Sequence, residues 1–392
     1  MSREYFALLF SAFFIYSCNT VFMVATPLFV IRLGSTEMMA GTQATLFLSV
    51  AVFLRFFFGP LADAYGRRVP LLLGSAVYLL TALGFFCATE LWQVFALRLV
   101  QAIGLAAFFP AAIATAAAYG GTARKGTFIG LLRLAASMSL MAGPVGALYL
   151  IDHHGYGPFF GSTAVAALIG MLAILCVSAR GIGSATDGPP NDAGADFQRR
   201  LNFLPLLAKY PLILAVTFAA AAGYGSFMSF AALFVKSSGS VLNAGLFFTL
   251  FSVGGIIANG TVGWLSDHAG RLRSILCTVL CLGAGTILFA LLPYQATCFY
   301  PAGLLAGAGY YGSIVVLMAW TTDRVDAAQR TAALSLQQNA LDAGIAVGSM
   351  VFGALQAYAN DYALLFGGLG LLYLFVAVLI GYCGKTSKTV SG

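Results

Sequence analysis

The stretch GPLADAYGRR, from Gly59 to Arg68, places one carboxylate and two guanidinium groups in an otherwise apolar neighbourhood. A second stretch, VGWLSDHAGRLR from Val262 to Arg273, repeats this pattern about two hundred residues later. A guanidinium can pair with a carboxylate across neighbouring helix ends, and glycine allows a tight turn. The two stretches therefore predict a charged latch between helix ends, and they predict that it occurs twice.

The composition of the chain is that of a membrane protein. Its 392 residues are 60% hydrophobic and only 8% charged, with a mean hydropathy of +0.91. Soluble domains carry about 25% charged residues, so this chain could not cover a water-exposed surface. The first apolar run, from Tyr5 to Val30, exceeds the roughly 7–15 residues of a signal peptide core and is long enough to span a bilayer.

Twelve apolar segments recur between short polar breaks, and each is long enough to cross a bilayer as a helix. Transmembrane barrel strands alternate over about 10 residues, so continuous runs of this length exclude a barrel. The sequence thus predicts an all-α membrane protein. The predicted spans are 5–32, 39–60, 70–89, 91–119, 127–151, 157–179, 205–235, 243–264, 273–293, 297–320, 332–357 and 362–383.

Basic residues gather on one side of these spans. Basic loops stay in the cytoplasm, so we expect both termini there, in a multi-pass protein of the cell membrane (the inner membrane in a Gram-negative bacterium). The net charge of +7 then needs no nucleic acid. Only Arg32 and Lys236 fall on the external side, while Arg55, Arg98 and Arg133 lie within spans. The other 15 of the 20 basic residues are Arg3, Arg67, Arg68, Arg124, Lys125, Arg180, Arg199, Arg200, Lys209, Arg271, Arg273, Arg324, Arg330, Lys385 and Lys388.

The chain divides into two related halves. Residues 40–68 and 244–272 share ten of 29 positions without a gap, including Asp63 with Asp267 and Arg67 with Arg271. The longest polar stretch lies between the halves and is rich in Gly, Pro and Asp, which is typical of a flexible linker. We predict a six-helix bundle over 1–180, a cytoplasmic linker over 181–204 and a second six-helix bundle over 205–392.

These features resemble the major facilitator superfamily over essentially the whole chain. The family's loop motif, G-x-L-a-D-x-x-G-R-[RK], matches both stretches, although Leu272 replaces the last basic residue of the second copy. The resemblance implies two bundles that rock around a central cavity, with the latch holding them together when the cavity opens outward. The simpler alternative is a loop of inside arginines. The predicted latch residues are Gly59, Asp63, Gly66, Arg67, Arg68, Gly263, Asp267, Gly270 and Arg271.

Two further motifs resemble those of proton-coupled antiporters in this family. RLVQAIG, beginning at Arg98, is similar to R-x-x-x-G-x-G, with Ala102 in place of the first glycine. SLMAGPVGAL is similar to the antiporter motif G-x-x-x-G-P-x-x-G-G, and Gly143 and Pro144 fit it. We assign these two residues to helix bending, because proline removes a backbone donor.

One carboxylate lies well inside a predicted span. Asp342 follows Gln337, Gln338 and Asn339, and a buried carboxyl group can take up and release a proton. Intramembrane charges are costly and usually functional. We therefore assign proton coupling to Asp342, Arg98 and Arg133. Alternatively, Asp342 is a structural partner of an arginine, and Arg55 and Arg133 extend to the cytoplasmic interface.

Three arginines against one aspartate favour an anionic, zwitterionic or neutral substrate over a cationic one. Carboxylates would be needed to bind a cation, but the first span carries Ser17, Cys18, Asn19 and Thr20 at the level where multidrug members of the family often have one. The resemblance also implies which helices line the cavity. The implied cavity residues are Asn19, Gln101, Tyr224, Asn259, Tyr310, Tyr311, Trp320 and Asn339.

The sequence therefore predicts a secondary transporter of a small organic solute, coupled to protons and exporting its substrate. The first alternative is a proton symporter or facilitator that imports an organic anion. A non-transporting sensor or a membrane enzyme is more remote, since no clustered catalytic set is visible. We expect a monomer in the lipid bilayer without a cofactor. Asp152, His153 and His154 lack a fourth metal ligand, and no phosphate-binding G-x-x-x-x-G-K-[ST] loop exists.

Overall fold

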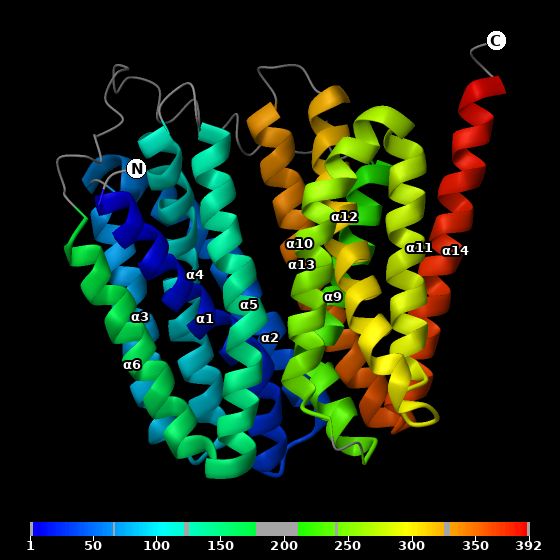
Figure 1. The fold of residues 1–392 in the computed structure, drawn as a ribbon. Coiled ribbons are helices and arrows are strands. Elements are labelled where there is room, and N and C mark those ends of the chain that lie inside the picture. Colours follow the sequence, from blue (N-terminus) through cyan, green and yellow to red (C-terminus); the bar gives the residue numbers. More distant parts are fainter. Residues whose placement is uncertain are drawn as a thin grey trace. The chain divides into compact units, whose positions relative to one another are not determined.

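The protein is described by a computed structural model, in which the described elements are helices (Figure 1). It describes residues 3–65, 67–120, 125–177, 211–239, 242–324 and 330–389. Within these ranges, 12 helices are long and apolar enough to cross a membrane. The predicted all-α fold with 12 spans is therefore confirmed, whereas the predicted linker over 181–204 lies outside the described residues.

The chain forms two compact units, Met1–Asp192 and Ala193–Gly392, which we call the amino-terminal and carboxy-terminal units. Long apolar runs become helices here because a bilayer offers no partner for a free backbone group. The amino-terminal unit contains α1 (Arg3–Arg32), α2 (Glu37–Tyr65), α3 (Arg68–Phe86), α4 (Leu91–Gly120), α5 (Lys125–His154) and α6 (Tyr156–Leu175). The carboxy-terminal unit contains α9 (Pro211–Ser237), α10 (Ala244–Ala269), α11 (Arg271–Ala290), the short 3-10 helix η2 (Ala296–Cys298), α12 (Phe299–Arg324), α13 (Arg330–Ala359) and α14 (Tyr362–Thr389).

The helices of each unit pack by the same scheme. In the amino-terminal unit, α4 packs against α2 and α3, α1 against α5, and α3 against α6. In the carboxy-terminal unit, α12 packs against α10 and α11, α9 against α13, and α11 against α14. Each pair in one unit has its counterpart in the other, as expected of two related halves.

The helices that carry the two latch motifs are longer than the sequence suggested. We expected spans ending at 60 and 264, but α2 continues to Tyr65 and α10 to Ala269. Nothing between Trp264 and Ala269 breaks a helix, and α10 ends only at Gly270, which has φ +89°. Glycine adopts this conformation without steric cost. Asp267 therefore lies on the last turn of α10 rather than in a loop.

Candidate functional site

A polar cluster lies inside the amino-terminal unit around Arg98 of α4. This side chain is fully buried. Its guanidinium donates hydrogen bonds to Oε1 of Gln101 and to Sδ of Met23, the latter at 3.4 Å. The guanidinium carbon also lies 4.0 Å from the ring centre of Phe47, in cation–π contact. Helices α1, α2 and α4 together hold this cation.

The cluster has more donors than acceptors. Nε of Arg98 and Nε2 of Gln101 are both buried without a hydrogen-bond partner in the described part of the chain. No described carboxylate lies within ion-pair distance of Arg98. Burying a cation inside a membrane span costs several kcal/mol, as an order of magnitude. The geometry therefore fits an additional acceptor, such as an anion.

The other predicted residues of this unit differ in burial and in contacts. Asn19 of α1 is half-buried and accepts a hydrogen bond from the hydroxyl of Tyr78 at 2.9 Å. Arg133 of α5 is exposed and is not among the groups that contact Arg98. Gly143 brings α5 close to α1, because an added Cβ would lie 3.1 Å from Val21. Pro144 lies inside α5 as predicted.

The carboxy-terminal unit buries its own carboxylate, Asp342 of α13. Only 5% of this residue is exposed, and its Oδ1 accepts a hydrogen bond from Gln338 at 3.3 Å. The neighbouring Gln337 accepts a hydrogen bond from Thr321 of α12 at 3.0 Å and donates one to Thr217 of α9 at 3.4 Å. This part of α13 is thus a buried polar segment joined to two other helices.

Three tyrosines of the predicted cavity set lie together in the same unit. The rings of Tyr224 and Tyr310 stack at 4.4 Å with an interplanar angle of 8°, and Tyr311 lies edge-on to Tyr310 at 5.1 Å. The remaining predicted residues lie elsewhere. Asn259 is exposed, Asn339 is half-buried, and the Trp320 ring is 5.0 Å from the guanidinium of Arg324.

The second latch motif forms an ion-pair network within its own unit. Arg271, at the start of α11, donates to Asp267 at 2.6 Å and to Ser266 at 2.7 Å. Its Nε donates to Asp323 on the last turn of α12 at 2.7 Å. A carboxylate near a helix C-terminus is disfavoured by the helix dipole, and the guanidinium offsets this at both helices. The motif therefore ties α10, α11 and α12 together.

Asp323 and Ser266 were missed by the sequence analysis. Asp323 is 52 residues from Arg271 and belongs to no motif, so only the tertiary fold reveals the pair. Gly263, a predicted latch residue, lies 4.0 Å from Val315 of α12 when a Cβ is added. At this distance a methyl group would make an ordinary van der Waals contact, so close packing of α10 and α12 does not by itself require glycine here.

The first latch motif is only partly described. The surroundings of Gly59 and Gly66 and the side chain of Asp63 lie outside what the structure describes. Arg68 donates a hydrogen bond to the backbone oxygen of Leu175, at the end of α6, at 3.1 Å. Arg67 is half-buried. This copy therefore also connects the ends of neighbouring helices, through Arg68.

The sequence profile of the Major Facilitator Superfamily matches residues 8–239 and 213–390, which together cover nearly the whole chain. The chain belongs to this superfamily. Its fold and relatives are those of membrane transporters rather than of an enzyme. The predicted resemblance is therefore confirmed.

Relatives within the superfamily match only part of this chain. The multidrug resistance protein MdtG of Salmonella paratyphi A is 29% identical over 143 residues, 35% of each chain. The multidrug transporter MdfA of Yersinia pestis (strain Angola) is 38% identical over 64 residues, 16% of each chain. This chain thus spans about a third or less of the length of these relatives.

Solved transporters of the same fold cover nearly the whole chain. A variant of the nucleoside transporter NupG matches with a TM-score of 0.80 and 13% identity, covering 98% of this chain and 99% of NupG. A peptide transporter, POT, in complex with sulfate matches with a TM-score of 0.79 and 14% identity, covering 98% and 95%. At such low identity, these likenesses establish the fold of this chain and nothing else about it.

Proposed function

We propose that this superfamily member is a proton-coupled secondary transporter that exports a small organic solute by alternating access. Both termini lie in the cytoplasm in this proposal, and the protein works as a monomer in the cell membrane. Fifteen of the 20 basic residues on one side support that orientation. The latch networks close and open the cytoplasmic ends of the helices.

The observation that carries proton coupling is the burial of Asp342. It lies about 18 Å along α13 from Arg330, at the usual rise of about 1.5 Å per residue, far from either helix end. A carboxylate there is stable only when it is paired, hydrogen-bonded or protonated. Its contact with Gln338 serves either form, because an amide can donate to a carboxylate and accept from a carboxyl group. This contact is compatible with Asp342 as the proton carrier.

The charge of the substrate follows from the cluster around Arg98. An unpartnered buried N–H of the Arg98 guanidinium and an unpartnered amide N–H of Gln101 favour an anionic, zwitterionic or neutral solute with strong acceptors. A cation would be repelled at the same place. The stacked Tyr224 and Tyr310 supply an apolar face that suits a planar group.

Export is supported by the partial relatives, which are multidrug proteins. The alternative is a symporter or facilitator that imports an organic anion. That alternative is favoured by one observation, the lack of a described carboxylate beside Arg98.

The proposed function is tested by proton-linked flux in proteoliposomes that contain an internal pH dye. Anionic, zwitterionic, neutral and cationic solutes are added in turn, with an imposed pH gradient of either sign. We expect an acceptor-rich solute to move protons against its own direction of travel. Movement of protons together with the solute would support the import alternative, and proton movement driven only by cations would contradict the proposal.

A further inference from the structure

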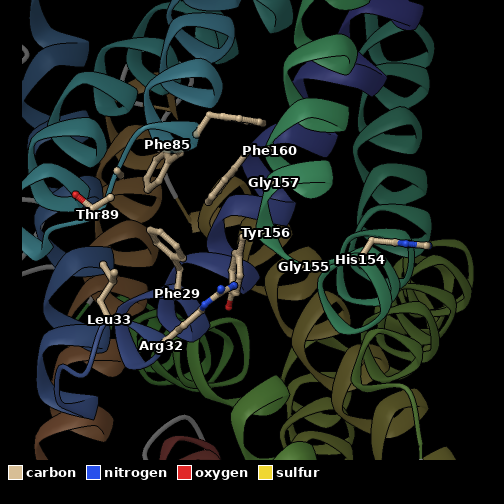
Figure 2. Close-up of a pocket in the computed structure, with 12 residues that line it drawn as sticks. Phe29, Arg32, Leu33, Phe85, Thr89, His154, Gly155, Tyr156, Gly157 and Phe160 are labelled. Atoms are coloured by element: carbon tan, nitrogen blue, oxygen red, sulfur yellow. The ribbon is translucent and has the colours of Figure 1, made fainter.

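A cavity of about 460 Å³ lies at the end of the amino-terminal unit opposite to Arg3 (Figure 2). The ends of α1, α3 and α5 and the start of α6 surround it, and five of its 12 lining residues are Phe or Tyr. Ligand sites usually measure about 300–1,000 Å³, so its size suits a small group. Phe29, Phe85 and Phe160 form a closed floor, with ring centres 5.3–6.4 Å apart.

The residues that line this cavity include Arg32 and His154, both exposed, and none of them is Asp or Glu. Asp152, which is not a lining residue, acts electrostatically on Tyr156. Arg32 lies over the ring of Tyr156 at 4.9 Å, as Figure 2 shows. Arg32 is also one of only two Lys or Arg residues on the side where membrane proteins have few of them. The charge bias of membrane proteins therefore does not explain Arg32, whereas binding of a negatively charged ligand would explain it.

Exposed apolar side chains continue from the cavity along two helices. Leu80, Leu83 and Phe86 are exposed at three-residue spacing on α3, so they form one stripe that ends at the cavity. On α6 the parallel stripe begins at Gly157 and passes through Gly161 to Val165, which is 57% exposed. A Cβ on Gly161 would lie 4.0 Å from the ring of Phe86, so the two stripes lie side by side.

Together these features match an amphiphile with an anionic head and an apolar chain. We propose that this cavity binds one anionic phospholipid, with its phosphate at Arg32 and an acyl chain along the exposed apolar stripes of α3 and α6. In the orientation proposed above, the lipid comes from the external leaflet. A soluble anion would contact the cation but not the apolar stripes, and a zwitterionic lipid would not supply a net negative charge.

The start of α6 adds to the attraction for phosphate. Its N-cap, Gly155, has no side chain to accept from the first backbone N–H groups, and such groups favour anions. The cavity, its cation and the exposed apolar stripes carry the proposal, and the helix start only reinforces it.

The test measures lipid binding by the purified full-length protein in a nonionic detergent. Native mass spectrometry follows the first bound lipid as dioleoyl phosphatidylglycerol or dioleoyl phosphatidylcholine is added. We expect phosphatidylglycerol to bind more tightly. Arg32→Gln should weaken its binding about tenfold, the effect of one lost charge-assisted contact, and should remove the preference between the two lipids.

Two further variants make the test specific. Gly157→Phe should also weaken binding, because its side chain would enter open space at the cavity, where no atom lies within 4 Å of an added Cβ. Lys236→Gln removes the other external basic residue, which does not line the cavity, and should bind lipid like the wild type. Equal lipid binding by the wild type and Arg32→Gln would overturn the proposal. Displacement of the lipid by millimolar glycerol phosphate would overturn it as well, since the ligand would then be a soluble anion. None of these outcomes depends on transport activity.

Discussion

The two units share one packing scheme but hold their helices together differently. In the carboxy-terminal unit, backbones touch. A Cβ on Gly225 of α9 would lie 2.2 Å from the oxygen of Ile345 on α13, and one on Gly307 of α12 would lie 1.8 Å from the oxygen of Phe251 on α10. A comparable approach occurs in the amino-terminal unit at Gly74, but Gly130 and Gly146 of α5 have no atom within 4 Å of an added Cβ.

The amino-terminal unit instead buries a cation among side chains. Arg98 is held by an amide, a thioether and an aromatic ring, groups that can rearrange when a ligand binds. Close backbone contact between helices depends on small residues and tolerates little change. We infer that the carboxy-terminal unit is the more rigid of the two, whereas the amino-terminal unit supplies the adaptable binding groups.

Adding one methyl group to the carboxy-terminal contact should give the largest loss of stability. Gly307→Ala forces α10 and α12 apart, and we expect a cost of about 3 kcal/mol, at the upper end for overpacking. The matched variant Gly146→Ala in the amino-terminal unit meets no atom and should be neutral or gain about 0.5–1 kcal/mol. Thermal unfolding in detergent compares the two. Equal melting temperatures would remove the proposed difference in packing.

Removing the buried cation should affect transport rather than stability. We expect Arg98→Met to lower the transport rate about 10- to 100-fold, because a hydrogen bond to a charged group contributes about 1.5–3 kcal/mol. Its melting temperature should stay the same or rise, since apolar replacements of buried charges are often stabilising. Arg98→Lys keeps the charge without the planar fork and should be intermediate. A large loss of stability with unchanged transport would mean that Arg98 is structural.

A smaller effect is expected where α9 and α13 are joined by hydroxyl groups. Ser349 donates to the oxygen of Gly225 at 2.9 Å, and Ser229 lies 3.0 Å from Ser349. Ser349→Ala should cost about 1 kcal/mol, the usual value of one buried hydrogen bond, and should leave transport nearly unchanged. Unfolding and flux measured on the same preparation test this. A greater effect on flux than on unfolding would contradict it.

The smallest effect on stability is expected at the second latch. Asp323 is half exposed, and ion pairs of this kind contribute about 0.2–1 kcal/mol. Asp323→Asn should change stability little but alter how often the cytoplasmic ends open, which cysteine labelling from that side can report. We expect Asp63→Asn in the first copy to act in the same direction. Labelling rates equal to those of the wild type would exclude the latch role.

Sequence patterns revealed much of the fold because membrane spans are set by length and hydropathy. They also singled out Arg98, Asp342 and the two charged loop motifs, since a charge inside an apolar run stands out, and the roles of these residues stay predictions. Asp323 was missed because its pairing with Arg271 depends on how α11 and α12 pack. The glycine contacts and the cavity beside Arg32 were missed for a similar reason: a glycine or phenylalanine in an apolar helix looks the same whether it faces lipid, a neighbouring backbone or a cavity.

The central claim is that Asp342 carries the coupled proton, and the most direct test compares two fluxes in the same proteoliposomes. The wild type and Asp342→Asn are assayed for solute counterflow and for proton movement. Asp361→Asn, which alters an exposed carboxylate at the start of α14, serves as the control. We predict that Asp342→Asn still exchanges solute but no longer moves protons in the opposite direction, while Asp361→Asn does both. Proton movement by Asp342→Asn at the wild-type rate would contradict the account.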